Sequence, residues 1–300
     1  MSATVHTTPT PAGPAAYPVQ PLHHLDTLWI QVAGTVCNLT CTHCFVPSGP
    51  GIRRHDLIAP ERVRALVREG LVLGVREVYF TGGEPFLHPE IMEMVEDTLA
   101  LAPLTVLTNG TLFTRERIER LATLSSAGIY SLELRVSLDG PTAAAHDRIR
   151  GQGTFARALE GLGRLSRAGL VPIVTATLMD GEDAAGANDR YVELLKSAGV
   201  ARPRLKLLPL FKLGREIERS GPYATHETLA GMGDAPFDTQ RLQCGHCRAV
   251  TSQGVFVCPL LVDEPGARMG DSLGESLGPF ALRHGACSTC FATGMTCANG

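Results

Sequence analysis

The sequence predicts an α/β fold, a partial (β/α)6 barrel of the TIM type with a small C-terminal domain. From residue 28 onward, short apolar runs alternate with helix-like stretches, and a cysteine-rich segment follows the last repeat. The chain has 300 residues and is 44% hydrophobic, enough for one large core with a small appendage. Six strand–helix repeats imply parallel strands joined by right-handed crossovers.

The expected elements follow in a regular order. β-Branched and aromatic runs predict strands at residues 28–32, 75–80, 104–108, 132–138, 171–178 and 204–210. Helices are expected between them, at residues 60–73, 89–100, 114–127, 154–168 and 184–198. Pro60 suits the first turn of the first helix, and Thr114 is placed to cap the third. The stretch that carries His146, Arg148 and Arg150 is expected to be a loop near the barrel mouth.

Outside the repeats we expect a tail, a linker and a terminal domain. Residues 1–24 are rich in Pro, Thr and Ala and lack the basic start and apolar run of a signal peptide, so they predict a flexible tail. The barrel should cover residues 25–215, a linker or lid residues 216–240, and the terminal domain residues 241–300. Nine cysteines in a chain that needs no disulfides favour metal binding in the reducing cytoplasm.

Charge and hydropathy exclude two classes of partner. The net charge is only -3, and charges of both signs are scattered along the chain, so no basic surface for nucleic acid or an anionic membrane is indicated. The apolar stretches are too short to span a bilayer. We therefore expect neither nucleic acid nor a membrane as a partner.

Three cysteines form the most informative motif of the chain. Cys37, Cys41 and Cys44 stand in a CxxxCxxC run, and three thiolates can hold a [4Fe-4S] cluster that leaves one iron open to bind a small molecule. The alternative is a zinc site, which takes four ligands and usually arrives as paired CxxC units. Zinc would leave the second motif unexplained.

This second motif, Gly-Gly-Glu-Pro, directly follows the second expected strand. Gly82 and Gly83 let the backbone approach a ligand closely, and Glu84 can accept a hydrogen bond from an ammonium group. Taken alone, the segment would be an ordinary turn. Its place after a three-cysteine loop makes the pair specific.

Together these two motifs resemble those of the radical S-adenosylmethionine (radical SAM) superfamily. The resemblance implies that the open iron binds the methionine part of SAM, and that one electron from the cluster cleaves SAM to a 5'-deoxyadenosyl radical. It implies that Gly82, Gly83 and Glu84 bind the SAM ammonium. It further implies the partial barrel with its chemistry at the carboxyl ends of the strands, a small-molecule substrate, and an electron donor such as flavodoxin or ferredoxin.

The same resemblance assigns further contacts to SAM. Ser137 and Asp139 are expected at the ribose hydroxyls, and Asn109 is a further candidate, with turn formation as the alternative for these loops. His43 stands where many family members carry Tyr or Phe against the adenine. Phe45 would supply a hydrophobic wall or an ordinary core side chain.

Two pairs of charged residues have less defined roles. Glu133 and Arg135 alternate with apolar neighbours, so both should point into the barrel, to bind SAM and substrate or to form a structural ion pair. Arg148 or Arg150 is a candidate for the SAM carboxylate.

Six more cysteines follow residue 240, and they resemble the SPASM or twitch extension of radical SAM enzymes, which holds auxiliary iron–sulfur clusters. The stretch from Gly254 to Cys258 is similar to the hairpin of that module. The set is too small for two clusters, so we expect one auxiliary [4Fe-4S] cluster, with Cys297 as a substitute ligand. The leading ligands are Cys244, Cys258, Cys287 and Cys290. A zinc ribbon from the two CxxC pairs is the alternative.

The surplus thiol suggests the reaction. One cluster leaves cysteines over, and a thiol can quench a substrate radical by donating a hydrogen atom. Cys247 is the best spare, because Cys244 has the module's expected distance to Gly254. We therefore predict a radical epimerase of a secondary metabolite, resembling the aminoglycoside (neomycin) epimerases of antibiotic biosynthesis. An acidic cluster is a candidate to attract such a polycationic sugar, with ordinary solvated surface as the alternative: Asp180, Glu182, Asp183 and Asp189.

Two alternatives remain. A radical SAM dehydrogenase or peptide maturase would use the auxiliary cluster for electron transfer and would not need Cys247. A non-catalytic zinc-binding module would contain zinc in place of iron and sulfide.

Overall fold

The computed structural model describes residues 17–179, 183–232, 238, 240, 242–294 and 297. Within them, the main sheet has nine strands in the order β10-β9-β8-β2-β3-β4-β5-β6-β7. Its barrel strands, all parallel to one another, are in chain order β2 (Thr27–Ile30), β3 (Glu77–Phe80), β4 (Leu104–Thr108), β5 (Leu132–Ser137), β6 (Ile173–Thr177) and β7 (Arg204–Leu208). The six predicted strands and their order are confirmed.

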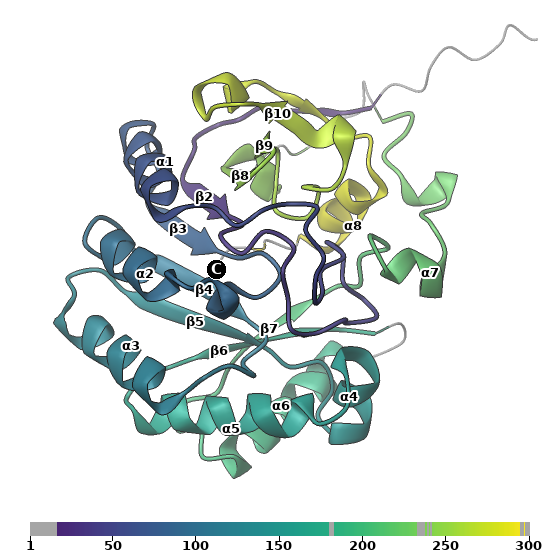
Figure 1. Cartoon of the computed structure of the whole chain (residues 1–300). Coiled ribbons are helices and arrows are strands. Elements are labelled where there is room, and N and C mark those ends of the chain that lie inside the picture. Colours follow the sequence, from purple (N-terminus) through teal and green to yellow (C-terminus); the bar gives the residue numbers. More distant parts are fainter. Residues whose placement is uncertain are drawn as a thin grey trace, which may run out of the picture.

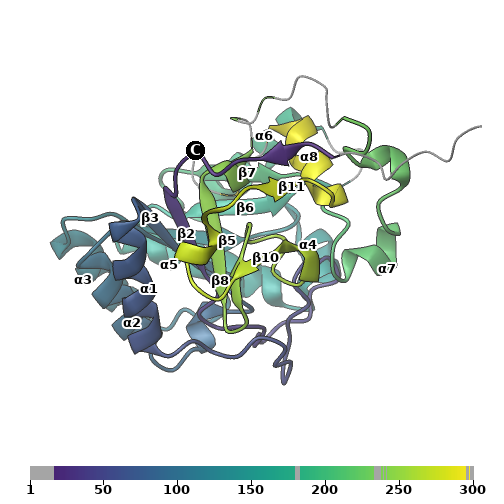
Figure 2. The same ribbon diagram turned by 90° about the horizontal axis from the view of Figure 1, so that it is seen from above.

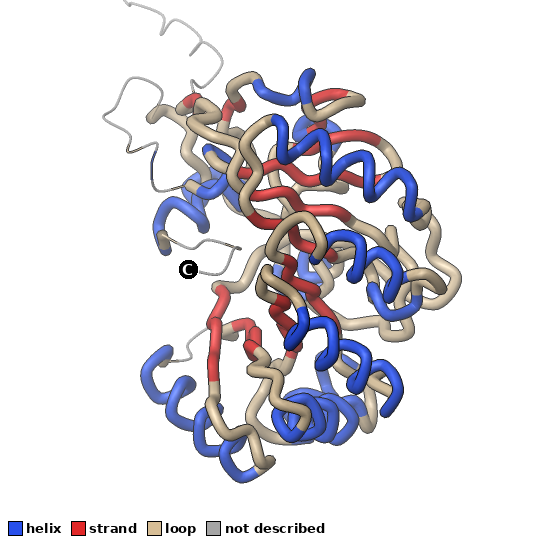
Figure 3. Tube along the Cα trace, turned by 90° about the vertical axis from the view of Figure 1, so that its left-hand side faces the viewer, coloured by secondary structure: helices blue, strands red, loops and turns tan. Residues whose placement is uncertain are grey.

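The predicted helices cover the outer face of this curved sheet (Figures 1 and 3). They are α1 (Pro60–Val72), α2 (Ile91–Leu99), α3 (Arg115–Ala127), α5 (Thr154–Arg167) and α6 (Ala184–Ser197). Pro60 opens α1, and the Thr114 hydroxyl accepts a hydrogen bond from the Arg117 backbone N–H at 3.2 Å, so both predicted helix starts are confirmed.

Strand β5 separates the two faces of the sheet. Leu134 and Val136 belong to the core between sheet and helices, so the alternate residues Glu133 and Arg135 face the barrel interior. Arg135 is buried there. The predicted orientation of this pair is confirmed.

Residues 143–150, which the sequence places in a loop, form a helix. Helix α4 (Ala143–Arg150) is capped by the Thr142 hydroxyl, which accepts a hydrogen bond from the Ala145 backbone N–H at 3.3 Å. Only His146 and Ile149 are buried on it. The loop prediction was wrong because so narrow an apolar face leaves almost no helical periodicity in the sequence.

The main sheet continues across the expected boundary between the barrel and the C-terminal domain at residue 241, because strands of the C-terminal segment join it. Strand β8 (Cys247–Thr251) pairs in parallel with β2, in the register Thr27↔Cys247. Strands β9 (Gly254–Phe256) and β10 (Arg268–Gly270) continue it in antiparallel fashion. Helix α8 (Gly285–Thr293) lies beside this segment (Figure 2).

The end of the expected flexible tail is ordered against the C-terminal segment. Strand β1 (Val19–Gln20) pairs with β11 (Phe280–Ala281), and the Leu282 backbone N–H donates to the Pro18 carbonyl at 2.9 Å. Residues 17–24 thus differ from the prediction, because their pairing partner lies far along the chain.

The expected linker contains helix α7 (Glu216–Ser220). Short 3-10 helices are η1 (Pro85–Leu87), η2 (Thr225–Glu227), η4 (Gln243–Gly245), η5 (Pro265–Ala267) and η6 (Gly274–Leu277). No helix in the described ranges is both long and apolar enough to cross a membrane.

Candidate functional site

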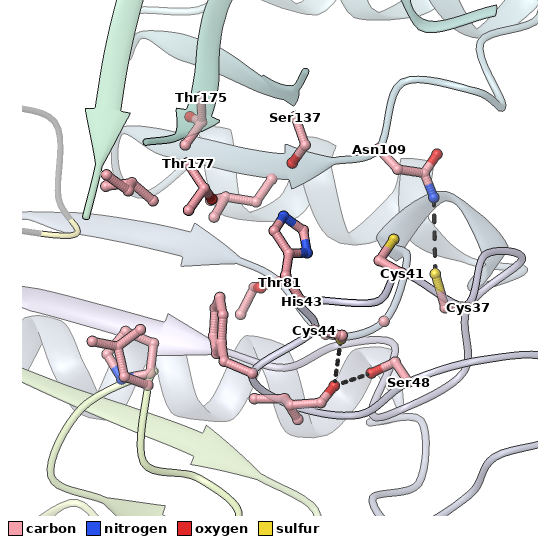
Figure 4. A pocket seen from close by; sticks show the side chains of 18 of the residues that line it. Cys37, Cys41, His43, Cys44, Ser48, Thr81, Asn109, Ser137, Thr175 and Thr177 are labelled. Atoms are coloured by element: carbon pink, nitrogen blue, oxygen red, sulfur yellow. Dashed lines mark hydrogen bonds between the residues drawn. The ribbon is translucent and has the colours of Figure 1, made fainter. Parts of the chain in front are cut away.

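The sequence motifs meet at one edge of the sheet. Because β2 to β5 are parallel, the loops that follow them share the same end of the barrel. Figure 4 shows the cysteine loop on one side of a cavity, with Ser137, Thr175 and Thr177 on the other and the His43 ring between them. The predicted residues that line this cavity are Cys37, Cys41, His43, Cys44, Phe45, Gly82, Gly83, Asn109, Ser137 and Asp139.

Hydrogen bonds from two segments that are distant in the sequence hold the cysteine loop. The Thr42 backbone N–H donates to the Ile149 carbonyl of α4 at 2.9 Å, and Arg215 Nη1 donates to the Cys41 carbonyl at 3.2 Å. Burial raises the pKa of the Cys37 thiol to about 12. A metal centre that binds this thiol must therefore displace its proton.

The two glycines let the second loop pack on the first. The backbone N–H of Gly83 donates to the Gly34 carbonyl at 2.8 Å, and a Cβ on Gly83 would lie 2.2 Å from the Val36 carbonyl oxygen. Gly82 adopts φ 131°, a conformation that side chains rarely allow. Both positions therefore require glycine to bring their backbone to the cavity wall.

Glu84 does not line the cavity. Its side chain is 0% exposed, and it accepts hydrogen bonds from the Thr108 hydroxyl at 2.8 Å, the Asn109 backbone N–H at 2.7 Å and the Phe86 backbone N–H at 3.1 Å. Burial raises its pKa, against these bonds. In the structure Glu84 ties the glycine loop to the end of β4, a role that the motif alone does not reveal.

Asp139 is the centre of a buried charged network. Its Oδ2 accepts from Arg150 Nε at 2.6 Å and from His43 Nε2 at 2.7 Å, while its Oδ1 accepts from the Thr177 backbone N–H at 2.7 Å. Although burial opposes the charge, Arg150 and His43 hold the pKa of Asp139 well below its usual range. Both oxygens of this expected ribose ligand are thus already bonded.

The side chain of Asn109 contacts the cysteine motif, since its Nδ2 donates to Cys37 Sγ at 3.9 Å.

His146 completes the network and gives a pH-dependent prediction. Its Nδ1 accepts from the Asp139 backbone N–H at 3.1 Å. Burial, and then the charge of Arg150, lower the pKa of His146 from 6.5 to about 4. The unfolded chain therefore takes up this proton first, and the stability of the fold falls as the pH drops from 6.5 to about 4.

The expected loss over this pH range is up to about 2 kcal/mol after allowance for solvent screening. His146→Asn keeps an acceptor for Asp139, and it should flatten this part of the pH profile. Urea unfolding followed by circular dichroism measures both proteins. Parallel profiles for the two would contradict the prediction.

Two cavity residues at the end of β2 were not predicted from the sequence. Trp29 Nε1 and Gln31 Oε1 are buried and have no hydrogen-bond partner among the described residues, and both side chains line the cavity. Two positions apart on β2, they face the same side, so strand alternation is the signal that would have found them. Arg135 also lines the cavity, donates to Thr175 Oγ1 at 3.2 Å, and donates to the Cys297 carbonyl.

The remaining predicted polar residues lie elsewhere. Glu133 Oε1 accepts from Arg204 Nη1 at 2.8 Å, so its observed ion-pair partner is Arg204. Asp183 caps α6, and Asp189 is exposed on it. Asp180 and Glu182 lie outside the described residues.

The aromatic candidate Phe45 does line the first cavity, and it is 38% exposed.

A second cavity gathers the C-terminal thiols. The cysteines that line it are Cys244, Cys258, Cys287, Cys290 and Cys297. Cys247 is absent from both linings; it is 0% exposed, and its Sγ donates to the Val257 carbonyl at 3.7 Å. Cys297 and Leu260 line both cavities, so they form the wall between them.

The donor sets fit iron–sulfur clusters and SAM. The three motif thiols line the first cavity together with Cys297, and five thiols including Cys297 line the second. His43 and Trp29 line the first cavity, and His43 Nδ1 and Trp29 Nε1 are buried without a hydrogen-bond partner in the described ranges. Both atoms are therefore available to form hydrogen bonds with a ligand. Over the same ranges, no three His, Cys, Asp or Glu side chains converge as ligands of a single metal ion would.

Comparison with known proteins agrees with this geometry. The family model described as the radical SAM superfamily matches residues 32–185. The AdoMet-dependent heme synthase of Methanosarcina barkeri is 35% identical over 142 residues, which cover 47% of this chain and 38% of that protein. The GTP 3',8-cyclase of Microcystis aeruginosa is 26% identical over 301 residues, covering 87% of this chain and 89% of that protein.

The fold has solved counterparts as well. The structure of SuiB from Streptococcus suis bound to S-adenosylmethionine aligns with a TM-score of 0.60 at 15% identity, over 82% of this chain and 62% of that one. The chain therefore spans less than two thirds of both SuiB and the heme synthase. At this identity the likeness concerns the fold.

Proposed function

Because the chain belongs to the radical SAM superfamily, we propose that it is a radical epimerase of a secondary metabolite. Members of the superfamily bind a [4Fe-4S] cluster and SAM. When bound, SAM is cleaved by one electron from the cluster and supplies the radical that takes a hydrogen atom from the substrate. An epimerase then returns a hydrogen atom to the opposite face of the same carbon. The observation that carries this proposal is the surplus of thiols: five line the second cavity, one more than a cluster needs, and Cys247 lies outside its lining.

The roles proposed at the first cavity follow from its lining. Cys37, Cys41 and Cys44 would hold the SAM-binding cluster. The backbone of Gly82 and Gly83 reaches the wall, as the close packing of their loop requires. The remaining predicted contacts would orient the nucleoside and methionine parts of SAM: His43, Phe45, Glu84, Asn109, Ser137 and Asp139. Among these, Glu84 would act by holding Asn109 in place, since it bonds the Asn109 N–H.

The C-terminal thiols divide between cluster and donor. A cluster needs four thiolates, and we propose Cys244, Cys258, Cys287 and Cys290, all of which line the second cavity. Cys247 lies on strand β8, outside this lining, and we propose it as the hydrogen donor. Cys297 remains the substitute ligand of the cluster.

Access is the requirement that this donor must meet. The Trp29 ring lines the first cavity and stacks on Tyr79 with ring centroids 4.1 Å apart. Both rings share an apolar cluster with Cys247. Because Cys247 is fully buried, this packing must open before a substrate reaches its thiol. Cys297, already at the cavity wall, is the competing donor.

The hydrogen balance of this step is simple. The substrate radical takes a hydrogen atom from the thiol, so a C–H bond forms, an S–H bond breaks and a thiyl radical remains. One electron and one proton then restore the thiol. We propose that the electron comes through the auxiliary cluster from a flavodoxin- or ferredoxin-type donor in the cytoplasm.

The test uses solvent deuterium, because a thiol exchanges its proton with water. We expect product with one deuterium at an inverted carbon when the reduced enzyme turns over in D2O. Cys247→Ala should still form 5'-deoxyadenosine but lose nearly all inverted product, while Cys297→Ala should retain it. Mass spectrometry and NMR of the product measure both.

Three other outcomes have distinct meanings. Loss of inversion in Cys297→Ala alone would move the donor to Cys297. Product without deuterium, oxidised by two electrons, would establish the dehydrogenase alternative. When GTP and an aminoglycoside are both supplied, conversion of GTP only would place the chain with the cyclase that it resembles. This result would refute the proposed substrate class.

An aminosugar of an aminoglycoside is the proposed substrate. Trp29 Nε1 can donate to a sugar hydroxyl, and Gln31 Oε1 can accept from a hydroxyl or an ammonium group. Both atoms are buried at the wall without protein partners in the described part of the chain. A substrate rich in hydroxyl and amino groups would satisfy them.

A further inference from the structure

An arginine stands against one of the three cluster cysteines. Arg150 Nη1 donates to Cys41 Sγ at 3.9 Å. The Arg150 side chain is only 13% exposed, and it lines the same cavity as Cys41. Its charge is therefore poorly screened by water and acts at close range on the sulfur.

Two features fix this guanidinium in place. Arg150 is the last residue of α4, and the neighbouring Ile149 carbonyl accepts the Thr42 backbone N–H at 2.9 Å, so the helix end and the cysteine loop are joined directly. On its other side, Arg150 Nε donates to Asp139 Oδ2 at 2.6 Å. The ion pair thus holds the cation beside Cys41 before any ligand enters.

The surroundings of Cys41 contain opposing charges. Arg150 and Arg215 favour negative charge on this sulfur, whereas Asp139 disfavours it. A reduced cluster carries one more negative charge than an oxidised cluster, so a nearby cation stabilises the reduced state and a nearby anion destabilises it. Hydrogen bonds to cluster sulfurs act in the same direction as a cation.

We propose that the Asp139–Arg150 ion pair sets the reduction potential of the cluster held by Cys37, Cys41 and Cys44. Arg150 raises the potential through its charge and its N–H group at Cys41, and Asp139 positions Arg150 while offsetting part of its charge. The electron comes from an external low-potential reductant and adds to the oxidised cluster, so no bond of the protein is made or broken. The proposal rests on the cluster ligands and not on the epimerase reaction.

Two neutral variants test it because they change the charge in opposite directions. In Arg150→Gln the ratio of reduced to oxidised cluster at one fixed applied potential should fall about tenfold, a shift of about 59 mV for one electron. In Asp139→Asn the ratio should rise. Arg150→Lys, which keeps the charge, should stay near the wild-type ratio. Arg157→Gln, an exposed change on the next helix, α5, should not move it.

The reconstituted protein is titrated with dithionite, without SAM, to the same potential for each variant. Electron paramagnetic resonance then measures the fraction of reduced cluster. The signal that changes when SAM is added afterwards identifies the SAM-binding cluster against the auxiliary one. Iron and sulfide analysis checks that each variant is loaded. If Arg150→Gln takes up too little iron, Asp139→Asn decides alone.

The outcomes separate the explanations. Opposite shifts in the two variants support the proposal. A purely structural role would lower both ratios together, and equal ratios with weaker SAM binding in Arg150→Gln would make this residue a SAM carboxylate ligand; either result overturns the proposal. A wild-type protein with no SAM-responsive signal would overturn the ligand assignment itself.

Discussion

Cys41→Ala is expected to abolish formation of 5'-deoxyadenosine. Three thiolates are the fewest that hold a [4Fe-4S] cube with one open iron, so the loss of one removes the site where SAM binds. Cys41 is buried at the wall of the first cavity, where Arg150 contacts its sulfur. Its loop contains only the three cysteines of the motif, so it holds no spare ligand. We therefore expect product at the level of a protein-free control.

Iron content makes this result specific. The variant should keep about four iron atoms per chain, those of the auxiliary cluster. Thr42→Ala is the matched control, since Thr42 is the exposed neighbour in the same loop and contributes a backbone bond that the substitution preserves. Near-normal 5'-deoxyadenosine from Cys41→Ala, measured by chromatography after dithionite reduction, would refute the ligand assignment.

Cys287→Ala is expected to separate SAM cleavage from product formation. Cys287 is buried at the second cavity, on α8, away from the first cavity's lining. Because Cys297 is the substitute ligand, the test variant also carries Cys297→Ala. The double loss should reduce iron from about eight to about four atoms per chain. Cleavage of SAM should continue, but the donor thiol would no longer be restored, so inverted product should stop after about one turnover.

Anaerobic assays of 5'-deoxyadenosine and product on one sample measure this ratio. Ser288→Ala, one residue further along the helix, is the control that keeps all cysteines. Zinc in place of iron in the wild-type protein, or full turnover by the double variant Cys287→Ala, Cys297→Ala, would contradict an auxiliary cluster with these ligands.

Local patterns were sufficient to predict the barrel. β4 begins and ends where its apolar run does, and the Thr114 cap marks the start of α3. Helix α4 escaped prediction because, apart from its alanines, Ile149 is its only apolar residue. The helix also contacts Asp139 through the Arg150 side chain, and no local sequence pattern encodes this contact between segments.

The candidate site was predictable in its residue types and less so in their contacts. The cysteine spacing and the glycine pair correctly predicted which end of the barrel carries the cavity. The glutamate of the second motif faces Thr108 and Asn109 because burial of its carboxylate requires hydrogen-bond donors, and β4 supplies them. Spacing separated Cys247 from the other thiols, but it could not show that the first cavity ends before it.

The pairing of β2 with β8 has a consequence for the order of events during synthesis. Strand β2 precedes the cysteine motif, yet its register partner Cys247 follows Thr27 by 220 residues. At about 5–20 residues per second, β2 waits on the order of ten to forty seconds for its second neighbour. Its open edge is a template for wrong pairing during this interval. We therefore expect nascent chains that end before β8 to depend on chaperones, and iron to be inserted stably only after the ribosome has passed residue 251.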